Sequence, residues 1–210
     1  MAVTMPKIEI TFRQKAVSLI SRSERGIAIL IVRDDTSKTF THKQYTDLSA
    51  LEADEALYTT DNYNAISDML SFAPYQSHVF RLDTDGTLGD TLAEISRTVK
   101  TGWITIAGMD SDDAAALASW VKTQDNTKAK SYKCVVYDVT PLPDDMHVVN
   151  FVNETVTFLD DRGASDGVEY LPSLLAIFAV CNVVRGCTNY HCSNLLTVEE
   201  VADNDAAVGA

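Results

Sequence analysis

Gly26-Ile-Ala-Ile-Leu-Ile-Val-Arg33 contains six consecutive apolar residues, four of them β-branched, between a glycine and an arginine. A strand with water on one face alternates apolar and polar residues, and this stretch does not. It therefore predicts a strand that is buried on both faces. Such strands are typical of the middle of a parallel sheet that helices cover on both sides.

The preceding segment, Lys7-Ile-Glu-Ile-Thr-Phe12, does alternate, with Ile8, Ile10 and Phe12 on one face. This pattern predicts a half-exposed, edge-type strand. Ser21-Arg-Ser-Glu-Arg25 is a polar hinge between this strand and the buried one. We expect an extended N-terminal arm that pairs with a sheet outside its own domain.

Strands and helices alternate three times after the buried strand. Helical apolar spacing and end signals mark the helices, and short β-rich runs mark the strands. This rhythm predicts an α/β fold with a mainly parallel sheet and helices on both faces. The predicted strands are residues 78–82, 103–107 and 132–137, and the predicted helices are residues 61–72, 87–100 and 111–121.

The alternation of strand and helix stops after residue 145. Residues 147–152 and 154–158, separated by Asn153, predict an additional β-hairpin or two short strands. Residues 171–184 are apolar almost all round, begin with Pro172 in the first turn and are followed by a glycine, which predicts a deeply buried helix.

The composition limits the possible partners. With 46% apolar residues the chain can fill a core, and its formal charge of −13 repels phosphate backbones and anionic lipid. No apolar run approaches the ~20 residues of a membrane helix, and the first residues lack the apolar core of a signal peptide. We expect protein partners, no nucleic acid, no membrane insertion and a cytoplasmic site of synthesis.

Four cysteines raise the question of a metal site. Cys181, Cys187 and Cys192 lie near His191, but five and four residues separate the cysteines, where zinc sites use short Cys-x-x-Cys hooks. We expect ordinary thiols, Cys134 included, and neither a metal nor a cofactor.

An acidic motif follows the strand at residues 78–82. Asp83-Thr-Asp85-Gly-Thr resembles the first motif of haloacid-dehalogenase-type phosphatases. That resemblance implies Asp83 as nucleophile, Asp85 as general acid/base and Mg²⁺ on the phosphate. Thr105 would be the phosphate-binding hydroxyl and Asp160-Asp161 the acidic metal motif, with Lys122 or Lys128 as the lysine.

The same residues suit a turn between a strand and a helix. Asp85-Gly86 can reverse the chain and Thr87 can cap the next helix. A calcium loop would need a third acidic position and a distal glutamate, which are absent. The sequence therefore leaves a Mg²⁺-dependent phosphatase as the alternative function and a structural turn as the simpler interpretation.

Three segments together resemble the contractile tail sheath proteins of myophages and phage-tail-like particles, in particular the short type of Gram-positive prophages. Residues 6–35 are similar to the arm, basic hinge and first buried strand of that family. The alternating middle is similar to its α/β domain. Residues 169–190 with 196–201 are similar to its apolar helix and Val-Glu-x-Val segment.

The resemblance implies a non-enzymatic subunit that polymerises around a tail tube and contracts to drive the tube through a cell envelope. It implies a linking arm at residues 1–20 with Ile8, Ile10 and Phe12, and a hinge at Arg22, Arg25 and Gly26. The α/β sheath domain would span 21–145, and 146–210 would begin a truncated C-terminal subdomain.

The implied partners are other copies of the chain, the tail tube protein, and baseplate and tail terminator proteins. The implied location is a virion tail or phage-tail-like particle assembled in the bacterial cytoplasm.

Overall fold

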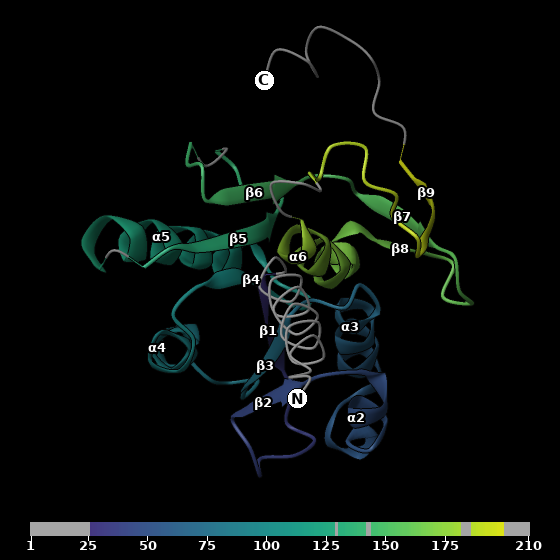
Figure 1. Cartoon of the computed structure of the whole chain (residues 1–210), viewed down its shortest axis with the longest axis horizontal. Coiled ribbons are helices and arrows are strands. Elements are labelled where there is room, and N and C mark those ends of the chain that lie inside the picture. The colour runs from purple at the N-terminus through teal and green to yellow at the C-terminus, as the bar shows by residue number, and fades with distance from the viewer. Residues whose placement is uncertain (1–25, 129, 142–143, 182–185, 200–210) are drawn as a thin grey trace, which may run out of the picture.

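The computed structural model describes residues 26–128, 130–141, 144–181 and 186–199. Its largest element is a six-stranded sheet in the order β2-β3-β1-β4-β5-β6 (Figure 1). Only β2 runs antiparallel to its neighbour, and the other pairings are parallel. The strands are β1 (Ile27–Arg33), β2 (His42–Tyr45), β3 (Gln76–Leu82), β4 (Gly102–Ile106), β5 (Tyr132–Tyr137) and β6 (Val148–Phe151).

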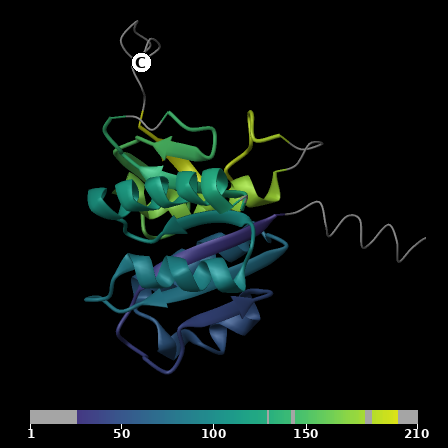
Figure 2. The ribbon, with the colours of Figure 1, turned by 90° about the vertical axis from the view of Figure 1, so that its left-hand side faces the viewer.

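Helices cover both faces of this sheet, as the unbroken apolar run of β1 predicts. Ile29 and Ile31 of β1 pack with α4 (Leu88–Thr98) and α5 (Ser111–Lys128), which lie in front of the sheet in Figure 2. Ala28, Leu30 and Val32 point to the other face, where they join a second core. The helices on that face are α2 (Leu48–Glu52), α3 (Thr60–Ser71) and α6 (Leu171–Val180). The α/β prediction is confirmed.

A second, antiparallel sheet of three strands lies beside the first, in the order β8-β7-β9. Its strands are β7 (Thr155–Phe158), β8 (Ala164–Asp166) and β9 (Leu195–Val198). Val156 and Phe158 of β7 form a third core with Tyr170 and Ile177, so α6 is packed between the two sheets.

Of the two alternatives predicted for residues 147–158, the β-hairpin is wrong and two short strands form. β6 pairs in parallel with β5 of the large sheet, whereas β7 pairs with β8 and β9. The connecting residues already have other partners: the Tyr137 hydroxyl donates to the Asn153 carbonyl and Gly167 N–H donates to the Glu154 carbonyl. The two strands are therefore directed into different cores and do not reverse onto each other.

Helix α6 is buried at eight of its ten residues, and its N-terminal turn contains Pro172. The predicted span to residue 184 was too long for the described part, because Cys181 is already extended and residues 182–185 lie outside it. The polar strands β2 and β8 were not predicted. No helix in the ranges that the structure describes is both long and apolar enough to cross a membrane.

Candidate functional site

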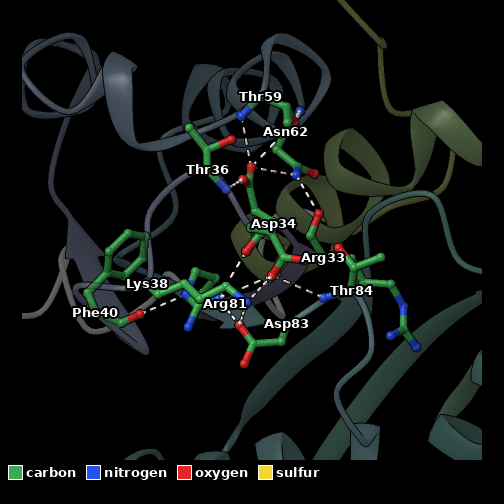
Figure 3. Close-up of polar contacts among 11 residues, drawn as sticks. Arg33, Asp34, Thr36, Lys38, Phe40, Thr59, Asn62, Arg81, Asp83 and Thr84 are labelled. Atoms are coloured by element: carbon green, nitrogen blue, oxygen red, sulfur yellow. Dashed lines mark hydrogen bonds and ion pairs between the residues drawn. The ribbon is translucent and has the colours of Figure 1, made fainter.

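The carboxyl ends of β1 and β3 meet at one edge of the sheet, where polar side chains gather (Figure 3). Asp34, directly after β1, is only 1% exposed. Its carboxylate accepts hydrogen bonds of 2.8 Å from Thr36 N–H, Thr59 N–H and the Asn62 side chain. Burial alone would raise the pKa of Asp34, but these hydrogen bonds outweigh it and the pKa is lowered. Asp34 is therefore a buried, fully paired carboxylate that fixes the start of α3.

Arg81 connects the turns that follow β1 and β3. Its buried guanidinium donates to the carbonyls of Phe40 (2.8 Å) and Asp34 (3.0 Å) and to the carboxylate of Asp83. Lys38 Nζ lies 3.5 Å from the same Asp83 carboxylate. Asp83 thus has two cations as partners and helps to neutralise the buried arginine.

The turn from Asp83 to Thr87 has the local structure expected of a strand-to-helix connection. Gly86 N–H donates to the Asp83 carbonyl at 2.7 Å. Thr87 is the N-cap residue of α4, as predicted, but its side chain accepts no hydrogen bond from the helix backbone and its hydroxyl donates to the Asp90 carboxylate at 2.5 Å. The side chain of Asp85 is exposed, and no hydrogen bond or ion pair engages it among the described residues.

The structure does not bring the proposed phosphatase residues together at Asp83. Thr105 lies opposite Leu30 in the sheet, three positions before the end of β1. Its hydroxyl is fully buried and donates to the Val135 carbonyl at 2.8 Å, so it cannot point to a phosphate at the sheet edge. Within the described part of the chain, we find no geometry that favours phosphoryl transfer at Asp83.

Asp160, from the proposed acidic metal motif, instead takes part in an ion-pair cluster beside the small sheet. Arg162 lies 2.7 Å from Asp160 and forms two hydrogen bonds of 2.8 and 2.9 Å to Asp68 of α3. Its guanidinium also stacks over the Phe158 ring, 3.8 Å from the centroid. Burial raises the pKa of Asp68, and the pairing with Arg162 offsets part of that effect. This cluster joins the small sheet to the α/β domain.

The four cysteines are thiols that form no disulfide: Cys134 lies on β5, and the other three follow α6. Over the residues for which the structure gives positions, no group of three His, Cys, Asp or Glu side chains is placed to hold a metal ion.

Open strand edges are the second feature that could serve a function. β2 and β6 end the large sheet, and β8 and β9 end the small one, without a further partner strand in the described ranges. Several large apolar side chains are exposed near β6, β7 and β9; Leu196, for example, is 63% exposed. These residues are Met146, Val152, Leu159, Leu196 and Val198. Edges of this kind can pair with strands from another chain.

The predicted linking residues mostly lie outside the described residues: Ile8, Ile10, Phe12, Arg22 and Arg25. Gly26 is described, and its N–H donates to the Ala179 carbonyl of α6 at 2.5 Å. A Cβ atom at Gly26 would lie 2.8 Å from that oxygen, which explains a glycine here. Gly26, the first described residue, is therefore held closely against α6.

No family model matches the chain, and no curated protein matches its sequence. Among the solved structures with a similar fold are two sheath tail proteins. A sheath tail protein from Desulfitobacterium hafniense has a TM-score of 0.69 and 11% identity, over 90% of this chain and 66% of that one. A sheath tail protein from Listeria innocua has a TM-score of 0.70 and 11% identity, over 93% and 67%. The chain thus spans about two thirds of the length of these proteins and matches their fold.

Proposed function

We propose that this chain is a structural, non-enzymatic subunit of a contractile tail sheath. The observation that supports this proposal most is the fold similarity to two sheath tail proteins, which extends over 90% and 93% of the chain. A structural role also agrees with the carboxyl edge of the sheet, where Asp34, Arg81 and Asp83 are engaged with one another or with the backbone.

In this proposal the subunits polymerise around a tail tube and remain linked during contraction. Residues 1–20 act as the linking arm: Ile8, Ile10 and Phe12 face a neighbouring subunit's sheet, and Arg22, Arg25 and Gly26 form the hinge. Backbone hydrogen bonds to an open strand edge would provide affinity, and the alternating side chains would set the register. The partners are other copies, the tail tube protein, and the baseplate and tail terminator proteins, in a virion tail or phage-tail-like particle.

The first test is assembly of the purified chain, followed by negative-stain electron microscopy and sedimentation. We expect tubular or ring-like polymers from the wild type. Removal of residues 1–20 should abolish them while circular dichroism and thermal unfolding remain unchanged. Polymers that form equally well without these residues would show that the arm is not the linker.

A matched pair of variants tests the face of the arm that makes the contact. Ile8→Ser, Ile10→Ser and Phe12→Ser together remove the apolar face, whereas Lys7→Ser, Glu9→Ser and Thr11→Ser alter the opposite face. Only the first set should prevent assembly, because the apolar face is the one that packs on the neighbour. Equal behaviour of the two sets would argue against strand addition.

A further inference from the structure

A groove of about 430 Å³ lies at the amino edge of the large sheet, where β1, β3, β4 and β5 begin. Aromatic and aliphatic side chains line it together with one lysine. Tyr75 is 46% exposed there, and the Lys133 amine lies 5.3 Å from the centroid of the Trp103 ring. Ile27 at the start of β1 and Gly102 at the start of β4 also line the groove. The groove is thus an exposed apolar surface with a cation at its rim.

A second lysine lies beside this groove. Lys100 directly precedes Thr101, which lines the groove. Lys100 and Lys133 are both exposed, and neither has a carboxylate partner among the described residues. The amino edge therefore carries cations that the described part of its own subunit does not neutralise.

The opposite edge of the same sheet carries the complementary charge. Asp85 is exposed on the turn after β3 and has no cation partner among the residues that the structure describes. Asp61 and Asp112 lie in the first turns of α3 and α5 at this edge. Two cations lie near this turn, Arg81 and Lys38, but both pair with Asp83 and do not neutralise Asp85.

The groove and Asp85 of one subunit cannot meet. Tyr75 and Asp83 flank the seven residues of β3, which span about 23 Å at the usual rise of a strand. A contact between these two surfaces therefore needs a second copy of the chain. Repetition of such a head-to-tail contact produces a ring or an open helical polymer and not a closed dimer.

We propose that a second copy docks its Asp83–Gly86 turn into the amino-edge groove, with Asp85 paired to Lys133 and its turn packed on Tyr75 and Trp103. This inference deepens the proposed function, and rests on it, by naming one surface through which successive subunits stack. It also gives Asp85 a role that the phosphatase interpretation does not supply.

Charge exchange tests this contact directly. Lys133→Glu and Asp85→Lys should each weaken self-association of the full chain about tenfold in sedimentation velocity, because like charges would then face each other. The double variant, in which every contact pairs the introduced glutamate with the introduced lysine, should recover association.

An equimolar mixture of the two single variants should recover association as well. When the two variants alternate, one contact pairs the introduced glutamate with the introduced lysine, and the next pairs the native Lys133 with the native Asp85. Each variant alone can form only contacts between like charges, so recovery in the mixture requires that the groove of one copy meets the turn of another.

Two controls make charge changes of the same size elsewhere. Lys128→Glu at the end of α5 and Asp144→Lys before β6 change exposed side chains that do not line the groove, and they should leave association within about twofold of the wild type. Association should also weaken between about 0.05 and 0.5 M salt, as expected for exposed charges.

The outcomes separate the two proposals. Sheath-like polymers that form with the same yield in the wild type, Lys133→Glu and Asp85→Lys would overturn the groove contact and leave the sheath function standing. Salt-sensitive association that follows the charge exchange, but yields no sheath-like tube or ring with the wild type, only chains of other shape, would support the contact and count against the sheath function. A double variant and a mixture that are both as weak as the single variants would also overturn the contact.

Discussion

Two aspartates that look alike in the sequence, Asp34 and Asp85, have opposite surroundings. Both follow a parallel strand at the same edge of the sheet. Asp34 is covered by the start of α3 and accepts hydrogen bonds from Thr36, Thr59 and Asn62. Asp85 is exposed and none of the described residues pairs with it. The difference shows that an acidic turn is structural or available for contacts according to what packs over it.

The largest expected effect is that of Asp34→Ala. It leaves the Thr36 and Thr59 N–H groups without their acceptor in a buried site and removes one of the two acceptors of the Asn62 amide, so we expect a loss of about 3 kcal/mol in the free energy of unfolding. Asp85→Ala should change it by less than about 0.5 kcal/mol. Urea denaturation monitored by circular dichroism measures the free energy of unfolding of both variants. A loss below about 1 kcal/mol for Asp34→Ala would contradict the difference inferred between Asp34 and Asp85.

Arg81→Met comes next, because Arg81 is the side chain that couples the two turns. Methionine keeps much of the apolar volume but leaves the Phe40 and Asp34 carbonyls without this donor, and we expect a loss of about 2 kcal/mol. The exposed Arg97→Met is the control and should cost less than about 0.5 kcal/mol. Equal effects in urea denaturation would mean that Arg81 contributes no more than a surface arginine.

Lowering the pH should reduce the free energy of unfolding in two steps. Burial, together with the nearby His42, lowers the pKa of His78 from 6.5 to about 4. The unfolded chain therefore binds the proton first, and stability from His78 is lost as the pH falls from about 6.5 to about 4. Asp34 gives the second step, at lower pH. The stability that its ionised carboxylate contributes is present above its unfolded-state pKa of 3.8 and is lost as the pH falls through its lowered folded-state pKa.

These two steps can be separated by measuring the free energy of unfolding across pH. His78→Gln should reduce the upper step and leave the lower one, whereas Asp34→Asn should reduce the lower step. Burial also lowers the pKa of His42, so part of the upper step should remain in His78→Gln. An upper step of unchanged size in His78→Gln would assign it to another group.

Apart from the exposed controls, the smallest expected effect is that of Asp83→Asn. Its side chain is about half exposed, and an asparagine can still accept a hydrogen bond from Arg81, so stability should fall by less than about 1 kcal/mol. We expect no Mg²⁺-dependent hydrolysis of a phosphomonoester by the wild type. Turnover that disappears in Asp83→Asn would restore the phosphatase alternative.

Several elements could be predicted because their signals are local. The apolar run at residues 27–32 required cover on both faces, and α4 followed from its apolar stripe at Leu88, Leu92 and Ile95. For the candidate site, the sequence pointed to Asp83 and Asp85 but not to Asp34, Asn62 or Arg81. Those three residues have no distinctive spacing, and their roles depend on contacts between segments 25 to 47 residues apart.

The sequence by itself determined the alternation of strands and helices, since the period of apolar residues reports local geometry. The tertiary structure alone decided that β6 and β7 belong to different sheets, that the polar segment His42–Tyr45 becomes a strand, and that Asp34 is buried while Asp85 is not. Each of these outcomes depends on which distant backbone or side chain satisfies the hydrogen bonds of the segment, and local periodicity contains no information about that partner.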